Sequence, residues 1–437
     1  MTESKIVGDA ERLFAELRRC TADATGAGVS RDSYGPGETR AIIAIQEEVQ
    51  RHAIGDRLTP FQHANDAGAL RIDVDAASNY YVTLPGEEPA APTVYCGSHM
   101  DSVPSGGNYD GAAGVVAGLL ALKHLAAHGV QPKRSIRLLI LRGEESAWFG
   151  KCYLGSLALF GKLTPADLAR RLRASDVSLE DRMRMCGADV ESIRAGKPLL
   201  DAKDVKAFLE VHIEQGPVLE KAGLPLGVVT GICGNVRQNV VCRGEAGHSG
   251  TTPMRLRSDA LMATTMLLSE LFRELVLFSV GDDLTFTVGK LHTDPTLEAV
   301  SVIPEVVRFT WEWRSVSAKR LRTFYDEIRE AYLPRIGSLC GVRFEVDEPI
   351  ITEPSKTDDQ LSSLLSTICE SRQIPYALLR SGAGHDAAVF AAQGIPTAML
   401  FIRNQHGSHN PHESMRMDDF ATAVAVLEEA LLTLANS

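Results

Sequence analysis

The fold is decided by a stretch that reads Thr93-Val94-Tyr95-Cys96-Gly97-Ser98-His99-Met100-Asp101. Its first five residues form a short apolar strand, and a histidine and an aspartate follow shortly after. The small and apolar residues from Ala112 to His128 predict a buried helix, and Ile136 to Leu141 predict a second buried strand. Strand, helix and strand in this order are the unit of a mostly parallel sheet. Ligands of such sheets bind beyond the carboxyl ends of the strands, where His99 and the pair Glu144-Glu145 lie.

Beyond this unit, the chain divides into two domains. A length of 437 residues exceeds that of one ordinary domain. Phe208 to His212 predict another buried strand of the first domain. Strands and helices between Val236 and Asp347 follow the order β-α-β-β-α-β, the ferredoxin-like pattern, which can close on itself. We therefore predict an α/β domain with a mixed, mostly parallel sheet from residues 1–232 and 351–437, and an inserted α+β domain of residues 233–350.

Composition and charge exclude several classes of protein. The formal net charge of -11 argues against a nucleic-acid surface, because phosphate binding draws on clustered Lys and Arg. The cysteines are scattered without a C-x-x-C pair, so neither a zinc ribbon nor a disulfide scaffold is indicated. The segment that starts at Met1 has no apolar leader, and no apolar run approaches about 20 residues. We expect a cytoplasmic protein that binds neither nucleic acid nor a membrane.

Polar motifs lie at or just beyond the apolar runs. They are His99-x-Asp101, Asp110, Glu144-Glu145, His212 and His409. Together they supply the ligands of a two-metal hydrolytic site, because two cations about 3.5 to 4 Å apart need a bridging carboxylate, terminal ligands and a shared water. Any one motif alone could be structural, such as a strand-end histidine or an exposed acidic turn. The joint occurrence of all of them at the strand ends of one sheet favours the metal site.

Individual positions indicate roles within this site. Asp101 stands two residues from His99, where an aspartate can take the second ring proton of a metal-bound imidazole. Asp110 follows a glycine-rich turn and could bridge two cations. In the pair Glu144-Glu145, one carboxylate would bind metal and the other would act as general base toward the metal-bound water. Zinc is the first expectation, and manganese, cobalt and nickel also accept such ligands.

Longer runs of sequence carry a resemblance to a known family. They read Gly97-Ser98-His99-Met100-Asp101-Ser102-Val103, His212-Ile213-Glu214-Gln215-Gly216-Pro217, Gly247-His248-Ser249-Gly250-Thr251-Thr252-Pro253-Met254, Gly382-Ala383-Gly384-His385-Asp386-Ala387 and Ser408-His409-x-Pro411-x-Glu413. In this order they resemble the M20 metallopeptidase family. More narrowly, they resemble its branch of N-carbamoyl-L-amino acid hydrolases, β-ureidopropionases and allantoate amidohydrolases.

The resemblance implies a metal-binding role for the matching histidines and carboxylates. His99 and His212 would each bind one metal ion, and Asp110 would bridge the two ions. Glu145 would join the site of His212, and His409 would complete the second site.

The resemblance also implies the remaining roles of the site. Glu144 would be the general base, and Asp101 would orient His99. His248, in the inserted domain, would stabilise the oxyanion when that domain closes as a lid, and the same domain would form a homodimer. The expected substrate-binding residues are Gln215, Arg314, Ser301 and His385, of which Gln215 and Arg314 would hold a carboxylate.

Two departures from the branch leave the substrate open. Ser301 stands where the branch usually has an asparagine that helps to hold the substrate carboxylate. Trp148 lies where the branch has Gly-x-Arg-Phe after the acidic pair, and it is either an apolar wall near the metals or a core aromatic. We predict a metal-dependent amidohydrolase that cleaves the ureido (N-carbamoyl) C-N bond of an amino-acid-like small molecule. The alternatives are an N-acyl amino acid amidohydrolase or dipeptidase, an allantoate amidohydrolase and a metal-free binding protein on the same scaffold.

Overall fold

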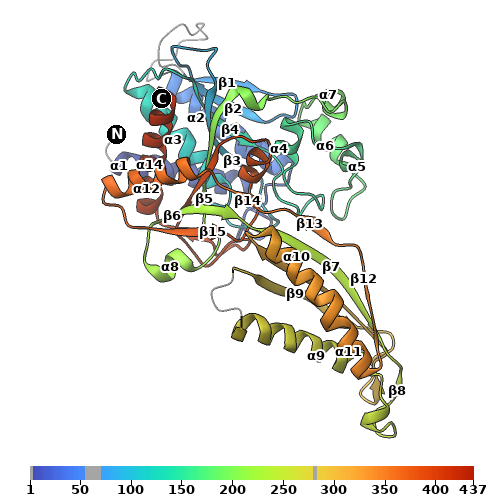
Figure 1. Ribbon diagram of the computed structural model, residues 1–437. Coiled ribbons are helices and arrows are strands. Elements are labelled where there is room, and N and C mark those ends of the chain that lie inside the picture. Colours follow the sequence, from blue (N-terminus) through green and yellow to red (C-terminus); the bar gives the residue numbers. More distant parts are fainter. Residues whose placement is uncertain (1–2, 55–69, 279–282) are drawn as a thin grey trace. The chain divides into compact units, whose positions relative to one another are not determined.

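The computed structural model describes residues 3–54, 70–278 and 283–437, in which the chain forms two compact units (Figure 1). Residues 1 and 2, with which the N-terminal segment of the prediction begins, lie outside this range. One unit comprises Met1–Thr230, Thr357–Ser381 and His385–Ser437, and the other comprises Gly231–Lys356 and Gly382–Gly384. No helix of the described part combines the length and the apolar character needed to cross a bilayer.

The first unit contains the main part of a large sheet whose strand order is β1-β2-β4-β3-β5-β16-β6-β14, with β15 beside β6; the last strand, β14, and the end of β6 belong to residues of the second unit. Four central strands run parallel to one another: β4 (Ile136–Leu141), β3 (Thr93–His99), β5 (Val205–Ile213) and β16 (Thr397–Ile402). Antiparallel strands flank them, namely β1 (Arg71–Val74) and β2 (Tyr80–Leu84) on one side and β6 (Leu226–Ile232) and β14 (Ser355–Lys356) on the other. The expectation of a mixed α/β sheet with a mostly parallel centre is confirmed.

A buried helix, α3 (Ala112–Ala127), connects β3 to β4 and packs on β3 and β5. Its small residues let it approach the sheet closely: a Cβ at Gly114 would lie only 2.1 Å from the carbonyl oxygen of Val211. The helices α1 (Glu3–Thr21), α2 (Pro36–Ile54) and α14 (Met417–Asn436) pack against α3 and complete the main core. Because α3 begins two residues after Asp110, this packing fixes the position of the Asp110 carboxylate.

The segment between β4 and β5 forms a separate, smaller cluster of short helices. They are α4 (Leu154–Leu159), α5 (Pro165–Leu168), α6 (Leu179–Met185), α7 (Val190–Arg194) and the 3-10 turn η1 (Ala202–Asp204). Capping boxes at Thr164 and Ser178 start α5 and α6. Their apolar side chains pack around Phe149 and Tyr34, and Trp148 lies partly buried against the same cluster.

The second unit has the chain order β-α-β-β-α-β. The elements are β7 (Gly234–Arg243), α9 (Ala260–Arg273), β9 (Thr285–Thr293), β11 (Val306–Ser315), α10 (Ala318–Glu327) and β12 (Arg343–Val346). Its sheet is antiparallel with the order β12-β7-β11-β9, and β13 (Ile350–Thr352) also pairs with β7. Helix α10 continues through the π-helical turn η4 (Ile328–Tyr332) directly into α11 (Leu333–Cys340).

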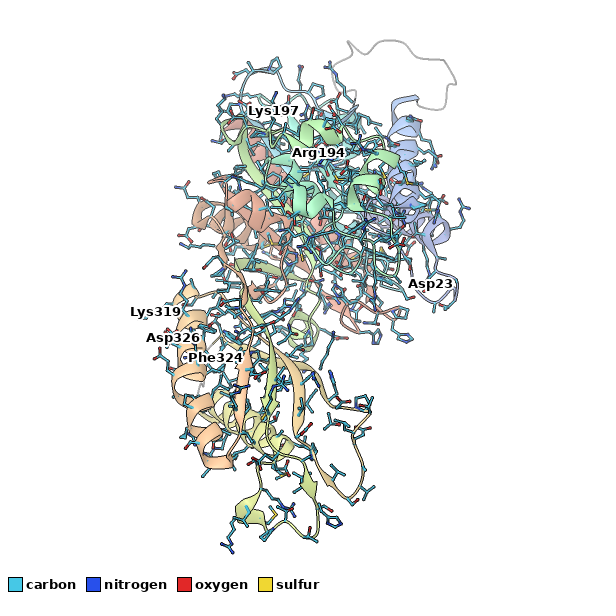
Figure 2. All side chains as sticks on the ribbon, turned by 90° about the vertical axis from the view of Figure 1, so that its right-hand side faces the viewer. Asp23, Arg194, Lys197, Lys319, Phe324 and Asp326 are labelled. Carbon is cyan, nitrogen blue, oxygen red and sulfur yellow. The ribbon has the colours of Figure 1, made fainter. Side chains whose placement is uncertain are left out.

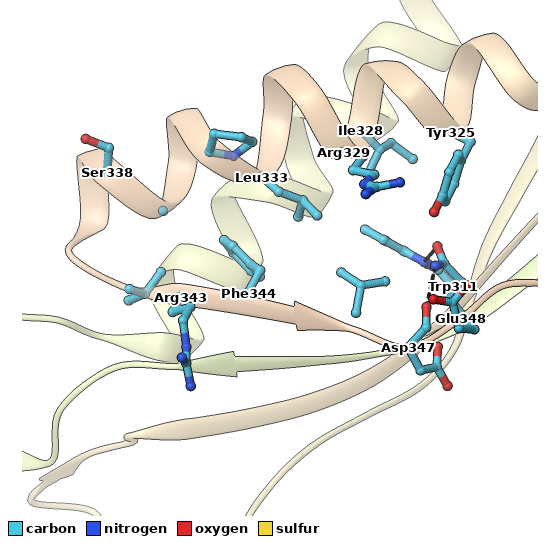
Figure 3. Close-up of a pocket in the computed structure, with 15 residues that line it drawn as sticks. Trp311, Tyr325, Ile328, Arg329, Leu333, Ser338, Arg343, Phe344, Asp347 and Glu348 are labelled. Carbon is cyan, nitrogen blue, oxygen red and sulfur yellow. Dashed lines mark hydrogen bonds between the residues drawn. The ribbon is translucent and has the colours of Figure 1, made fainter.

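Helix α10 shows why this second unit can form its own core. Leu321, Phe324 and Ile328 recur at helical spacing and are buried against the tryptophans of β11, whereas Lys319 and Asp326 are exposed (Figure 2). An open cavity of about 460 Å³ lies between α10, η4, α11 and β12, next to Trp311 and Phe344 (Figure 3). None of the predicted site residues lines this cavity.

Candidate functional site

The expected metal ligands of the first unit meet at the carboxyl ends of its parallel strands. His99 is the last residue of β3, His212 lies at the end of β5, and Glu145 follows β4. Asp110 precedes α3, and His409 lies in the loop between β17 (Asn404–Gln405) and β18 (Ser414–Met415). Parallel strands end at the same edge of a sheet, so residues far apart in the sequence gather there.

Asp110 belongs to two groups of donor atoms that could each hold a metal ion. In the first group, the Nε2 atoms of His99 and His212 lie 3.5 and 3.3 Å from Asp110 Oδ1. In the second group, His409 Nε2 lies 3.3 Å from Asp110 Oδ2 and 3.1 Å from Glu145 Oε1. The two oxygens of one carboxylate therefore face two different sets of donors.

This grouping corrects the expected division of the ligands. Glu145 was expected beside His212, but it lies with His409, and His212 lies with His99. The strand order explains the difference, because β3 separates β4 from β5. His99 and His212 therefore end neighbouring strands, and Glu145 approaches Asp110 from the other side.

The donors fit divalent cations in number and in chemistry. Asp110 Oδ1 is buried and accepts no hydrogen bond, although two imidazole nitrogens face it. Hydrogen bonds with Asp110 and Glu145 raise the pKa of His409 to about 11, as is expected for an imidazole held between two carboxylates. Imidazole nitrogen and carboxylate oxygen are ligands that zinc and related transition metals accept.

Asp101 connects the first group of donors to the acidic pair. Its Oδ1 atom lies 3.2 Å from His99 Nδ1 and accepts the backbone N–H of Glu144 at 2.9 Å. Its Oδ2 atom accepts the N–H of Glu145 at 3.0 Å and the hydroxyl of Ser33 at 2.6 Å. One buried carboxylate thus holds the His99 ring and the backbone that carries both glutamates.

Glu144 lies next to the ligands and belongs to neither donor group. Its side chain is buried. Burial raises the pKa of Glu144 well above its usual range, and the nearby carboxyl group of Glu145 acts in the same direction, whereas His99 opposes the shift. These surroundings therefore favour the protonated form of Glu144 more than water does.

The glycine and loop residues around Asp110 are closely fitted. A Cβ at Gly111, whose φ is +65°, would lie 2.5 Å from the His99 ring, so only glycine fits this position. Ser408 Oγ lies 2.6 Å from Asp110 Oδ2 and 2.5 Å from Glu413 Oε2. Glu413 also accepts the N–H groups of Tyr109 and Asp110. The Ser408-to-Glu413 motif therefore supports Asp110 as well as providing His409.

Gln215 and Glu214 explain the motif that follows His212. Glu214 accepts the N–H groups of Val218 and Leu219 and so caps the short helix α8 (Val218–Ala222). Gln215 has a φ of +64° and donates its Nε2 to Asp110 Oδ2 at 2.9 Å, and its buried Oε1 has no hydrogen-bond partner. Strained backbone of this kind gathers at functional sites, and His409 shares it with a φ of +61°.

His385 lies behind the metal ligands. Its ring is buried, 4.5 Å from the ring of His212, and its Nε2 is hydrogen-bonded to Ser381 Oγ at 2.8 Å. Glu210 joins these two histidines as a third possible metal-binding group, and its carboxylate accepts the hydroxyl of Ser98 and the N–H of Ala387. With these contacts Glu210 anchors β5, β3 and the start of α13 (Asp386–Ala391).

The expected residues of the second unit do not lie together. His248 ends the short strand β8 (Gly247–His248), which pairs with β10 (Val302–Ile303), and the Ser301 carbonyl accepts the N–H of Ser249. Arg314 lies near the other end of β11, where it donates to Glu312 at 2.6 Å and to the Gly382 carbonyl at 2.7 Å. Eight residues of β11 separate Val306 from Arg314, or about 26 Å at the usual rise of a strand.

Residues outside the predicted set also support the site. Sequence reasoning missed Ser33, which binds Asp101, and gave Ser408 and Glu413 no role although both stand in a quoted motif. Trp148 donates its indole N–H to the Ser102 carbonyl at 2.7 Å and packs on the small helical cluster, as in the second of its two interpretations.

The sheet and the shared carboxylate at its strand ends define a class, the metal-dependent hydrolases of α/β fold. The chain belongs to peptidase family M20/M25/M40, whose sequence pattern matches residues 95–433. This membership confirms the family resemblance that the sequence motifs carry.

Curated relatives and solved structures narrow the branch. The allantoate amidohydrolase of Escherichia coli (strain K12) is 35% identical over 376 residues, which cover 86% of this chain and 89% of the relative. The N-carbamoyl-L-amino acid amidohydrolase of Geobacillus stearothermophilus is 35% identical, covering 92% and 94%. The crystal structure of an amidase of the hydantoinase/carbamoylase family from Burkholderia multivorans is 26% identical, with a TM-score of 0.84 and 98% of each chain covered.

Proposed function

We propose that this chain is a metal-dependent amidohydrolase that cleaves the C-N bond of a ureido (N-carbamoyl) group on an amino-acid-like small molecule. The observation that carries the proposal is one carboxylate, Asp110, shared by two donor groups beside a buried glutamate, Glu144. The names of the relatives support the substrate class, because they refer to N-carbamoyl amino acids and to allantoate. Allantoate itself remains the second candidate for the same reason.

The ligand set supports two divalent cations, with zinc as the first candidate. His99 and His212 would hold one ion, Glu145 and His409 the other, and Asp110 would bridge them. When bound, such ions polarise the substrate carbonyl and lower the pKa of a bound water. Asp101 keeps the Nδ1 of His99 engaged, which leaves its Nε2 as the atom available to a metal.

Glu144 is the proposed proton carrier. Its carboxylate takes a proton from the attacking water and later gives it to the leaving nitrogen, so no covalent enzyme intermediate is needed. Burial favours the protonated form of Glu144, which suits the second transfer. His248 would donate a hydrogen bond to the oxyanion of the tetrahedral intermediate.

We also propose that the enzyme is a homodimer joined through its second unit. The exposed face of α9 and of the π-helical turn η3 (Glu274–Phe278) that continues it carries Met262, Met266, Phe272 and Val276, all more than a third exposed. Strand β9, next in the sequence, is the edge of the sheet, with Leu291 exposed. An apolar helix face beside an open strand edge fits a second copy of the same unit.

The separation inside the second unit supports a role for the second copy. His248 pairs with Val302, four residues before the start of β11, whereas Arg314 lies eight positions along β11, about 26 Å from Val306. We therefore infer that the two do not contact one small substrate from the same chain. A closing motion of the whole unit leaves this distance unchanged. We therefore propose that His248 of one subunit serves the metal centre of the other.

A substrate panel tests the proposed reaction. The metal-loaded protein is assayed with N-carbamoyl, N-acetyl and longer N-acyl derivatives of one amino acid, and with allantoate. Hydrolysis of the ureido compounds releases ammonia, whereas hydrolysis of an N-acyl compound releases a carboxylic acid and no ammonia. We expect ammonia from an N-carbamoyl amino acid. Turnover of the N-acyl compounds alone would replace this proposal by an acylase.

A further inference from the structure

A buried cation, Arg31, lies beside the loops that carry the proposed ligands. Its side chain is fully buried, and it forms no ion pair within the described residues. Burial lowers the pKa of Arg31 to about 10, so the guanidinium remains charged at neutral pH. A buried charge costs folding free energy, and the negative charges of Glu413, Asp110 and Asp101, which favour the charged form of Arg31, offset part of that cost.

The hydrogen bonds of Arg31 all lead to two ligand-bearing loops or to the helix that precedes them. Its Nη2 donates to the carbonyl oxygen and to the side-chain oxygen of Asn108, at 2.8 and 2.6 Å. Its backbone exchanges two hydrogen bonds with Ser102, which follows Asp101. Its Nε lies 3.4 Å from the hydroxyl of Thr21, the last residue of α1.

The bonds to Asn108 fix the backbone two residues before Asp110. Asn108 cannot turn away, because its own amide donates to the Phe14 carbonyl at 2.8 Å. The direction of the Asp110 carboxylate depends on this backbone. Oδ1 must face His99 and His212 while Oδ2 faces His409, if both donor groups are to share the carboxylate. Both bonds come from the one Nη2 atom of Arg31, and the rigid planar guanidinium fixes the directions of its two N–H groups toward the Asn108 oxygens.

We propose that Arg31 is a positioning residue that holds Asp110 in the orientation shared by both donor groups. The proposal rests on the proposed role of Asp110 as a bridging ligand. In this role Arg31 raises the affinity of the site for metal and does not contact the substrate. Supporting residues of this kind change metal affinity by about 10- to 100-fold when they are replaced.

Metal titration against a chromophoric chelator tests this role without any substrate. The variants are Arg31→Gln, which removes the charge and shortens the side chain, and Arg31→Lys, which keeps the charge and replaces the rigid guanidinium by a flexible ammonium group. Arg137→Gln is the matched control, because Arg137 is a half-buried arginine near the opposite end of β4 from Glu144 and binds Thr83. Thermal melting of each metal-free variant gives the folded fraction.

The direction of the change separates the explanations. We expect zinc binding about 10- to 100-fold weaker in Arg31→Gln and also weaker in Arg31→Lys, with Arg137→Gln unchanged. If Arg31 acted only through its charge, Lys would have no effect and Gln would bind zinc more tightly, since a nearby positive charge repels a cation. If its role were only structural, melting would change and affinity would not.

Each remaining outcome also has a definite meaning. If Arg31→Gln does not fold, the Lys variant decides between the three explanations. Unchanged affinity in a folded Lys variant would overturn the proposal. A wild-type protein that binds no zinc in the same titration would contradict the proposed metal site itself, which is a different failure from wild-type binding with unaffected variants.

Discussion

Two adjacent residues, Glu144 and Glu145, have different surroundings. Glu145 Oε1 lies 3.1 Å from His409 and belongs to a donor group, whereas Glu144 belongs to none. Asp101 accepts hydrogen bonds from the backbone N–H groups of both residues and so fixes the backbone from which the two carboxylates extend. The sequence pattern predicted one ligand and one base at this pair, and the structure supplies a physical reason for assigning which is which.

This difference leads to a prediction for matched substitutions. Glu144→Gln should lower kcat by about 10²- to 10⁴-fold, the usual contribution of a general base, while metal content stays at the wild-type level. Glu145→Gln should lose metal from its group. Metal analysis of the purified variants and initial rates on the substrate identified by the panel provide the measurements. Activity retained in Glu144→Gln would rule out its role as base.

The residues of the site differ in how far the sequence could predict them. His99, Asp110 and His212 stand at the ends of apolar runs, and this local pattern placed them together. The partnership of Glu145 with His409 could not be predicted, because it depends on β3 lying between β4 and β5, and strand order arises from long-range pairing. Arg31 and Ser33 were missed because buried polar residues of a loop have no periodic pattern.

At the scale of elements, three helices are joined by one buried carboxylate. Glu48 of α2 accepts hydrogen bonds from Arg12 of α1, at 2.7 Å, and from Lys123 of α3. Both Glu48 and Lys123 are buried. Burial alone would raise the pKa of Glu48, but the hydrogen bonds from Arg12 and Lys123 outweigh it and hold the pKa below its usual value. Since α3 begins after Asp110, this contact stabilises the element that positions the site.

The lowered pKa of Glu48 fixes the sign of a pH effect. A carboxyl group with a depressed folded-state pKa stabilises the protein above its unfolded pKa, and this contribution is lost as the pH falls through the folded value. Glu48→Gln should therefore lower the free energy of unfolding by about 1.5 to 3 kcal/mol at pH 7, and by progressively less below pH 4. Urea unfolding at both pH values measures the difference.

The neighbouring Glu47 provides the control for this experiment. Its side chain is about half exposed, and its ion pair with Arg51 is long, at 3.5 Å. Glu47→Gln should change stability by no more than about 0.5 kcal/mol at either pH. An equal loss for both variants, or a Glu48→Gln loss that does not shrink in acid, would mean that the buried contact is not the source of the stability.

At the scale of the whole molecule, the order of strands and helices in the second unit was predictable from the sequence. The positions of His248 and Arg314 within that unit were not. The periodicity between Val236 and Asp347 gave the order β-α-β-β-α-β, as the structure has it. Local pattern could not indicate that His248 pairs with Val302 in a separate two-stranded sheet while Arg314 pairs with Asn235 at the far end of β11 from Val306, because both facts depend on strand pairing. The role of His248 in the site stays a prediction, either within its own chain or toward the partner subunit.

Mixed dimers distinguish action within one chain from action between chains. A subunit with His248→Ala keeps its Glu144, and a subunit with Glu144→Gln keeps its His248. In a dimer of the two, a site that takes His248 from the partner subunit contains one complete set of residues. A site that uses only its own chain contains none.

Co-expression of the two variants should therefore restore activity that neither has alone. Random pairing makes half of the dimers mixed, with one complete site of two, so the expected rate is about a quarter of the wild-type rate per subunit. Glu144→Gln with Glu145→Gln is the control: both defects lie in the first unit, so no pairing completes a site. Activity restored in this control would mean that subunits also share residues of the first unit, so restoration would not be specific to His248. If sedimentation shows dimers but neither mixture regains activity, His248 does not act between subunits. It would then act within its own chain, and Arg314 would not contact the substrate in that site.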